Sequence, residues 1–245
     1  RRIKRHVIGK VHTFFAATAP GMESLCRDEL VAPGLGAREV SVTKGGVLFQ
    51  GRIRECYMAN LKLRTANRVL MRIDTFRATN FGQLAKKMAD IPWELFLHRD
   101  AAVKIRVSAS RSRLYHTGAV AEQCRHSMAR KRGTVGSGAE EQEEISRFPQ
   151  QVFIRAVKDH FVVSIDSSGD LLYKRSLKTQ GGKAPLRETT AAAVLALSAY
   201  HGDEPLMDPM CGSGTFSLEA AMIANQIPAG WYRTFAFMGW PAFRS

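Results

Sequence analysis

The stretch Asp208-Pro209-Met210-Cys211-Gly212-Ser213-Gly214-Thr215 decides how the second half of this 245-residue chain is expected to fold. Two glycines separated by one residue let the backbone pass close beneath a ligand, at positions where a Cβ atom would collide with it. A helix is expected to follow over 215–224, because Leu218, Ala221 and Met222 recur at helical spacing. The free backbone N–H groups of that helix would then point at polar atoms of the ligand.

The segments around this stretch predict the opening of a doubly wound α/β domain. An alanine-rich helix is expected over 187–200, a short strand over 205–208 and a tight loop over 209–214. Helix, strand, Gly-rich loop and helix is the order in which such a domain begins. No Lys follows Gly214, which excludes a P-loop, and Ser217 stands where the dinucleotide fingerprint has its last glycine.

The acid-to-glycine spacing Asp-x-x-x-Gly-x-Gly resembles motif I of Rossmann-like methyltransferases. In that family the loop holds the amino-acid and ribose parts of S-adenosylmethionine (SAM). The resemblance implies that this chain takes SAM as its cofactor, whereas the alternative is a glycine turn needed only for packing a strand against a helix. The predicted cofactor-binding residues are Asp208, Pro209, Cys211, Gly212, Gly214 and Thr215, with Lys183, Pro185, Leu186 and Arg187 as second choices. For Arg187 the alternative is that it only begins a helix and pairs with Glu188 or with solvent.

The residues before this domain predict two small α+β units. The first has strand, helix, hairpin, helix and strand over 12–73, with its hairpin turn at 44–46. The second starts near Asn80 and is predicted to contain these elements: a half-exposed strand over 103–107, a helix over 117–131, an exposed loop over 133–146, and strands over 152–157, 161–166 and 171–173.

Four further strings extend the resemblance over nearly the whole chain. Leu114-Tyr115-His116-Thr117-Gly118-Ala119-Val120, Ser164-Ile165-Asp166-Ser167-Ser168-Gly169 and Leu172-Tyr173-Lys174-Arg175 look like the THUMP region of bacterial rRNA guanine-N2 methyltransferases. Lys183-Ala184-Pro185-Leu186-Arg187-Glu188-Thr189 is similar to the segment that precedes motif I in that family. The resemblance implies methyl transfer to the exocyclic amine of a guanine in 23S rRNA.

The expected fold class is α+β (ferredoxin-like plus THUMP) followed by the beginning of an α/β Rossmann-like methyltransferase domain. The expected domains are a ferredoxin-like domain over 1–75, a THUMP RNA-binding domain over 76–172, and a linker with an incomplete methyltransferase domain over 173–245. In the family, an acidic residue and an Asn/Asp-Pro-Pro-Tyr/Phe segment follow motif I, and neither occurs before Ser245. No catalytic residue is therefore assigned, and the chain by itself is expected to be inactive. The alternatives are a non-catalytic RNA-binding adaptor and a methyltransferase that acts on tRNA.

The formal net charge of +14 points to a polyanionic partner. Nine Lys or Arg residues and two acids lie between Arg99 and Arg132, and five bases and no acid lie between Lys174 and Arg187. The alternative is a solvated surface that binds no partner. The predicted RNA-binding residues are Lys104, Arg106, Arg111, Arg113, Arg125, Arg130, Lys131 and Lys174.

The remaining composition excludes several classes of protein. Hydrophobic residues make up 45% and charged residues 24%, which is typical of a globular chain rather than a disordered one. No apolar run reaches the roughly 18 residues of a membrane span, so no membrane partner and a cytoplasmic location are expected. The four cysteines lack zinc-ligand spacing, so no metal site is predicted, and core or loop thiols are expected. The oligomeric state is left open.

Overall fold

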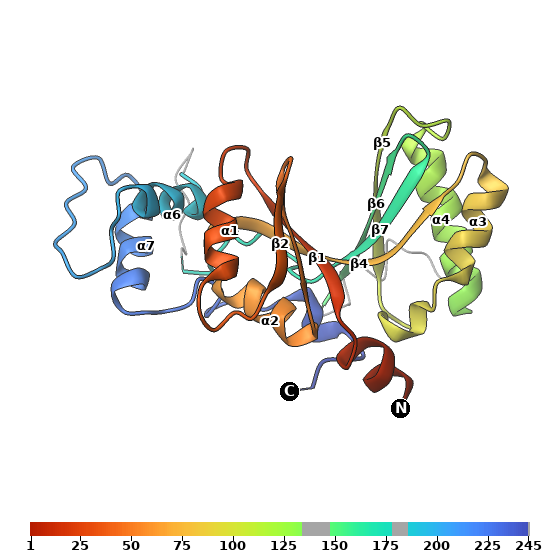
Figure 1. Ribbon diagram of the computed structural model, residues 1–245, viewed down its shortest axis with the longest axis horizontal. Helices are drawn as coiled ribbons and strands as arrows, with labels where there is room; N and C mark the ends of the chain where they lie inside the picture. Colours follow the sequence, from red (N-terminus) through yellow and green to blue (C-terminus); the bar gives the residue numbers. More distant parts are fainter. Residues whose placement is uncertain (134–147, 178–185, 245) are drawn as a thin grey trace. The chain divides into compact units, whose positions relative to one another are not determined.

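The computed structural model describes residues 1–133, 148–177 and 186–244 (Figure 1). The chain divides into two compact units, each built from separate segments. Unit 1 comprises Arg1–His12, Leu70–Gly169 and Phe235–Ser245, and unit 2 comprises Thr13–Val69 and Asp170–Thr234. The strands follow one another in the order β2-β3-β1-β4-β7-β6-β5, and β4 runs from unit 2 into unit 1.

The first part of unit 2 has the predicted order of strand, helix, hairpin, helix and strand. Its elements are β1 (His12–Thr18), α1 (Glu23–Val31), β2 (Arg38–Thr43), β3 (Gly46–Gly51), α2 (Ile53–Lys62) and the start of β4 (Ala66–Arg77). Thr43 pairs with Gly46, which leaves a two-residue turn in which Gly45 has a φ of 85°. The rings of Phe14 and Phe49 stack in the core with their centroids 5.2 Å apart.

The second part of unit 2 contains α6 (Glu188–Leu197) and α7 (Thr215–Ala224), close to the two predicted helices. The strand predicted over 205–208 is wrong: residues 205–207 are exposed, and no strand of the described ranges pairs with them. Without a neighbouring strand, the N–H and C=O groups of an extended segment stay unpaired.

The strand predicted over 171–173 is also wrong. Lys174 N donates to Leu171 O at 3.0 Å and closes a turn, and Leu172 N makes a single ladder-like bond to Asn67 O at 2.8 Å. The alternating apolar residues of this segment therefore serve a turn, with Leu172 buried beneath it.

Unit 1 is built on the strands β4, β7 (His160–Asp166), β6 (Gln150–Val157) and β5 (Val103–Ser110). β5 lies parallel to β6, and the other pairs are antiparallel. Helices α3 (Phe81–Asp90) and α4 (Thr117–Arg132) pack on each other, and α4 packs on β5 (Figure 1). The short helices η1 (Lys4–Ile8), η2 (Trp93–Leu95) and η3 (Ala236–Gly239) complete the unit.

The two faces of the sheet in unit 1 differ in polarity. Ile105, Ile154 and Val163 are buried on one face, whereas the alternate residues Lys104 and Arg106 are exposed on the other. This confirms the predicted half-exposed strand. Of the predicted loop over 133–146, only Gly133 is among the described residues, and it ends α4 with a φ of 68°.

The C-terminal residues belong to unit 1. The Trp240 indole N–H donates to Gln150 Oε1 at 2.9 Å, and Phe237 N donates to Ser167 O at 3.0 Å. Three of the four free cysteines, Cys26, Cys56 and Cys124, are buried, and Cys211 is exposed on a loop, as predicted. Within the ranges described, every helix is too short or too polar to cross a bilayer.

Candidate functional site

The loop before α7 adopts a backbone that requires its two glycines. Gly212 has a φ of 50° and Gly214 a φ of 69°, a region where side chains are strained. Gly214 N donates to Cys211 O at 2.7 Å and closes the turn, and Gly214 is the N-cap of α7. Apart from the two chain neighbours of Gly214, no atom of the described residues lies within 4 Å of the position that its Cβ would take, so open space adjoins the loop there. The predicted close approach of a ligand is therefore sterically allowed.

Asp208 supplies an acceptor at the start of the loop. Its Oδ1 accepts a hydrogen bond from Met210 N at 3.1 Å, whereas its Oδ2 is buried without a hydrogen-bond partner among the described residues. A buried carboxylate oxygen without a donor costs free energy, and a ligand amine or hydroxyl would relieve that cost. SAM carries donors of both kinds, so the loop fits the cofactor that the sequence predicts. Pro209 and Cys211 are both exposed.

The segment before α6 is joined to the loop. Thr215 Oγ1, in the first turn of α7, donates to Leu186 O at 3.3 Å. Arg187 is the N-cap of α6, as the alternative for this residue proposed, and its guanidinium lies 5.3 Å from the centroid of the Tyr173 ring. The other two second choices, Lys183 and Pro185, lie outside the described residues.

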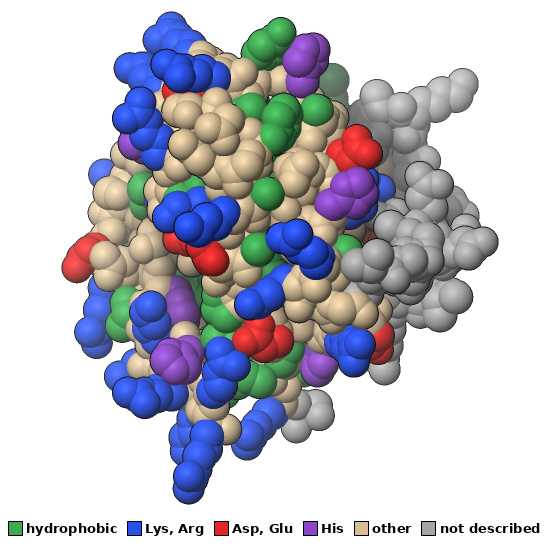
Figure 2. Space-filling model, turned by 90° about the vertical axis from the view of Figure 1, so that its right-hand side faces the viewer, with side chains coloured by type: hydrophobic (Ala, Val, Ile, Leu, Met, Phe, Trp, Pro, Cys, Tyr) green, Lys and Arg blue, Asp and Glu red, His purple; other side chains and the backbone are tan. Residues whose placement is uncertain are grey.

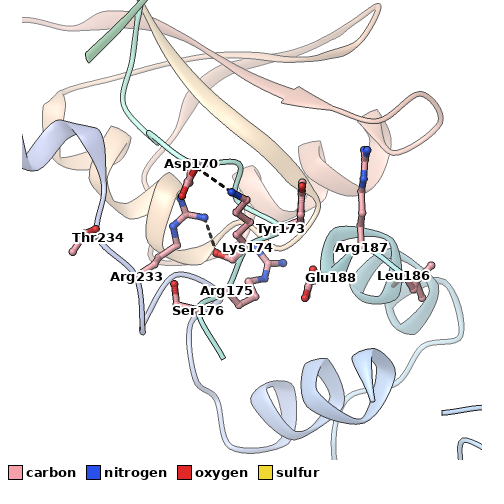
Figure 3. A pocket seen from close by; sticks show the side chains of 10 residues that line it. All are labelled: Asp170, Tyr173, Lys174, Arg175, Ser176, Leu186, Arg187, Glu188, Arg233 and Thr234. Atoms are coloured by element: carbon pink, nitrogen blue, oxygen red, sulfur yellow. Dashed lines mark hydrogen bonds and ion pairs between the residues drawn. The ribbon is translucent and has the colours of Figure 1, made fainter. Parts of the chain in front are cut away.

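A cavity of about 360 Å³ in unit 2 brings together residues predicted for two different ligands (Figure 3). Leu186 and Arg187, predicted for the cofactor, line it together with Lys174, which was predicted for RNA. Lys174 Nζ lies 3.3 Å from Asp170 Oδ1 in an exposed ion pair. The cavity lining therefore contains four cationic residues, two carboxylates and one aromatic ring, next to the segment that is bonded to the loop.

Arg233 lines this cavity, and its side chain binds the backbone of the turn that forms one wall. Its guanidinium donates to three carbonyl oxygens: Leu171 O at 2.8 Å, Lys174 O at 3.0 Å and Asp170 O at 2.6 Å. These bonds hold the turn that replaces the predicted strand, and they explain why that turn is well defined without a sheet partner.

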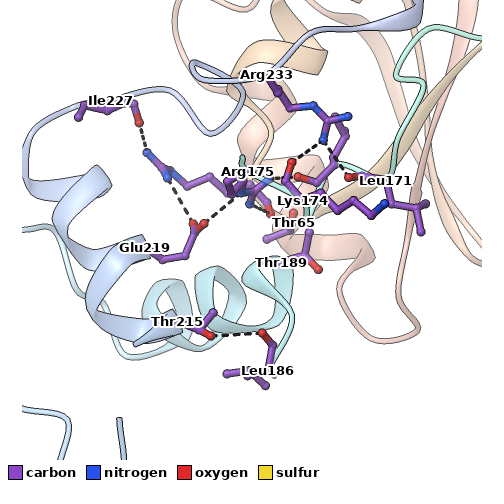
Figure 4. A network of polar contacts seen from close by, with 12 residues as sticks. Thr65, Leu171, Lys174, Arg175, Leu186, Thr189, Thr215, Glu219, Ile227 and Arg233 are labelled. Carbon is purple, nitrogen blue, oxygen red and sulfur yellow. Dashed lines mark hydrogen bonds and ion pairs between the residues drawn. The ribbon is translucent and has the colours of Figure 1, made fainter. Parts of the chain in front are cut away.

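A buried ionic network fixes α7 to the rest of unit 2 (Figure 4). Glu219, on α7, accepts from Arg175 Nε at 3.0 Å and lies 3.4 Å from Arg64 Nη1. Arg175 also donates to Leu172 O at 2.6 Å and to Arg64 O at 2.7 Å, and Arg64 donates to Ile227 O at 2.6 Å. The Arg175 and Glu219 side chains are 2% and 1% exposed, so each charge depends on its partners for solvation.

The network extends to α1 through Glu29. Arg64 N and Thr65 N donate to Glu29 Oε2 at 2.8 and 3.4 Å. Burial raises the pKa of Glu29, and these two N–H donors oppose that rise. Burial also lowers the pKa of Arg64, against the opposing effect of Glu219.

The sequence assigned no role to Arg64, Arg175 or Glu219. One signal was available, because Glu219 is the only charged residue in the apolar helix Thr215–Ala224. A lone charge on an apolar helix requires a buried partner of opposite sign. The identity of that partner could not be read from the chain, because Arg64 is 155 residues away.

The predicted RNA-binding residues of unit 1 are exposed, but the structure does not bring all of them together. Lys104 and Arg106 lie on β5, Arg111 and Arg113 follow it, and the remaining three lie on α4: Arg125, Arg130 and Lys131. Lys174 belongs to unit 2. The basic stretch also contains a residue with a structural role, because Arg132 donates to the carbonyl oxygens of His98, Arg99 and Ala101.

Comparisons with known protein families match two segments of the chain. The RlmL ferredoxin-like domain family matches residues 13–70, and the RMKL-like methyltransferase domain family matches residues 175–242. These matches and the mixed α/β fold confirm the predicted fold class for those two parts. The THUMP assignment and the three domain boundaries stay predictions.

Two curated relatives cover almost all of the chain. The putative RNA methyltransferase YpsC of Bacillus subtilis is 31% identical over 94% of this chain and 59% of its own length. The ribosomal RNA large subunit methyltransferase K/L of Syntrophotalea carbinolica is 33% identical over 95% of this chain and 33% of its own length. The chain thus spans between a third and three fifths of the relatives that it matches.

A solved structure agrees with these relatives. SMU.472, a putative methyltransferase complexed with SAH, is 32% identical, and the match covers 95% of this chain and 60% of that chain with a TM-score of 0.78. The chain is therefore similar over nearly its whole length to the ribosomal RNA large subunit methyltransferases K/L, and its residues 13–70 and 175–242 match the RlmL ferredoxin-like and RMKL-like methyltransferase domain families.

Proposed function

We propose that this chain is the RNA-binding and cofactor-loop part of a SAM-dependent RNA methyltransferase that methylates N2 of a guanine in 23S rRNA. The observation that carries the proposal is the loop Asp208–Thr215, with two glycines at positive φ, open space above Gly214 and an unsatisfied oxygen on Asp208. Two similar proteins support the proposal. One is named a ribosomal RNA large subunit methyltransferase, and the other, SMU.472, was solved with SAH, the product that SAM leaves after methyl transfer.

Three residues of the loop and the helix that follows it have separate tasks in this proposal. Bare backbone at Gly212 and Gly214 admits the ligand, the N-terminal end of α7 orients its polar atoms, and Asp208 accepts from a ligand amine or hydroxyl. SAM supplies an electrophilic methyl group when it is bound. The buried pair Arg175–Glu219 holds α7, and therefore the loop, in one position before a ligand arrives.

The amine of guanine is a weak nucleophile, so the protein's contribution is alignment and stabilisation of the positive charge that develops on the amine. No residue of the loop or of the buried network is proposed to align the guanine amine or to stabilise this charge. Exposed Lys and Arg side chains hold the RNA. The candidates are the RNA-binding residues predicted in unit 1, together with Lys174 of unit 2.

The experiment that tests the proposal is a methyl-transfer assay of the intact protein with labelled SAM and undermethylated ribosomal RNA, followed by mapping of the modified base. Label at N2 of a guanine in 23S rRNA is the expected result. Label on tRNA alone would establish the alternative substrate. RNA binding without any transfer of label would establish the non-catalytic adaptor.

A further inference from the structure

One end of the sheet in unit 1 gathers residues that are far apart in the sequence. The strand register places Ser110, Val157, His160 and Arg77 in one row across β5, β6, β7 and β4. The loops that leave this row carry Arg111, Arg113 and Lys158, and Figure 1 shows the end of β5 beside the β6–β7 turn. At about 4.8 Å between strands, the row is about 14 Å long.

The charge at this end is almost entirely positive. The segments 77–87, 110–116 and 157–160 contain a single carboxylate, Asp159. Asp159 Oδ1 accepts from Arg113 N at 2.7 Å, and Oδ2 lies 4.0 Å from Arg113 Nε. The Asp159 carboxylate is therefore paired with one basic residue of this end, Arg113. Figure 2 shows Lys and Arg side chains outnumbering carboxylates on the coloured part of the face that carries α3 and α4.

A cavity of about 590 Å³ lies on the α3 side of this row and is lined by Arg77, Thr79, Gln83, Lys86 and Lys87. Gln83 Oε1 already accepts from Thr79 N at 2.9 Å and from Thr79 Oγ1 at 3.1 Å. The same wall carries three cations, Arg77, Lys86 and Lys87, none of which forms an ion pair within the described part of the chain. A site lined by three cations and no carboxylate favours an anion.

The turns themselves are held in a costly conformation. Arg111, Lys158 and Asp159 have φ values of 50°, 50° and 63°, a region that glycine occupies at no steric cost. Strained non-glycine residues cluster at functional sites, where a particular side chain is needed. Tyr115, two residues beyond Arg113, adds an aromatic ring that is 66% exposed and lies against the His116 ring at 4.3 Å.

We infer that Arg77, Lys86, Lys87, Arg111, Arg113 and Lys158, here called the sheet-end cluster, form the surface of unit 1 that grips consecutive phosphates of an RNA strand, with Tyr115 available to stack on a base. Exposed cations in a row bind the backbone, and an adjacent aromatic ring binds bases without sequence preference. This inference rests on the proposed function for the identity of the polyanion. It adds Arg77, Lys86, Lys87 and Lys158 to the residues that the sequence pointed to.

The test compares two triple variants of the intact protein. Arg77→Gln, Lys86→Gln and Lys87→Gln together remove the cations of the cavity. The matched control, Arg38→Gln, Lys44→Gln and Arg54→Gln together, removes the same charge from exposed positions of unit 2. Binding of a fluorescent oligouridylate of about 12 nucleotides is measured by anisotropy over a range of salt concentrations.

If each lost contact contributes about 0.7 to the slope of log K against log salt, the sheet-end variant loses about 2 from the slope and about 100-fold in affinity at 0.1 M salt. The control variant keeps both within a few-fold of wild type. Thermal unfolding of each variant reports whether it is folded, and unchanged melting is expected because all six side chains are exposed.

Equal affinity of the sheet-end variant and the wild type would overturn the inference while leaving the proposed function standing. An equal loss in the control would also overturn it, because net charge alone would then explain binding. A wild-type protein that binds no RNA even at low salt would instead refute the proposed function. Wild-type binding to anionic phospholipid vesicles but not to the oligouridylate would assign the cluster to a membrane surface and overturn the inference.

Discussion

Replacing Arg175 by Met tests whether the buried network holds the cofactor loop in place. The substitution removes the hydrogen bonds of Arg175 to Glu219, Leu172 O and Arg64 O. Among the described residues, Glu219 then keeps one ion pair, with Arg64 at 3.4 Å. Because the Glu219 side chain is 1% exposed, water cannot replace the lost partner. Breaking a buried pair of this kind costs about 3–5 kcal/mol of unfolding free energy. In a chain of this size that corresponds to a fall of about 6–20 °C in melting temperature.

The assay is urea unfolding, monitored by circular dichroism, of the wild type, Arg175→Met, Glu219→Leu and the double variant. In the double variant neither charge is left alone, so its loss should be smaller than the two single losses combined, by about 1–3 kcal/mol. Lys174→Met is the matched control, because it removes the neighbouring exposed pair with Asp170, which is worth at most about 1 kcal/mol. A loss in Arg175→Met no larger than that in Lys174→Met, or strictly additive single losses, would refute the reasoning.

Two further predictions concern single side chains. In the native protein Cys211 should be alkylated by iodoacetamide much faster than Cys26 or Cys124, because Cys211 is exposed whereas burial raises the pKa of Cys124 to about 12 and that of Cys26 further still. Bound SAM should slow the alkylation of Cys211. Mass spectrometry that finds Cys124 labelled before Cys211 would contradict this prediction. Burial raises the pKa of Glu29 above its ordinary value of 4.5, so the folded state binds a proton more tightly than the unfolded state and the wild type should lose stability as the pH rises from about 4.5 towards neutrality. Glu29→Gln should lose less over that range, and identical pH profiles of melting temperature in the two proteins would show that Glu29 ionises as freely when folded as when unfolded.

Local patterns predicted most elements of the fold. Alternation of Lys104 and Arg106 with buried neighbours identified β5, and helical spacing identified α4 and α7 almost to the residue. These predictions succeeded because each depends on which face of one element is buried. The strand over 205–208 failed because a strand also depends on a partner elsewhere in the chain, which the composition of the segment cannot reveal.

The candidate site was predictable to a similar extent. The turn over 209–214 needs glycine at two positive-φ positions, and this requirement is visible in the sequence at Gly212 and Gly214. The residues that hold the loop were not visible, because Arg64 and Arg175 reach Glu219 across the fold. The sheet-end cluster was missed in part for the same reason: only the pairing of β4, β7 and β6 brings Arg77 and Lys158 to the same end of the sheet.

The measurement that tests the central claim most directly is calorimetric titration of the intact protein with SAM, in the wild type and in Gly214→Val. The control is Gly45→Val, since Gly45 has a similarly positive φ and equally open surroundings but lies in the β2–β3 turn. We expect wild type and Gly45→Val to bind SAM and Gly214→Val to show no binding heat while remaining folded. An absence of heat with SAM in the wild type, together with binding of a nicotinamide dinucleotide or a nucleoside triphosphate, would contradict the account.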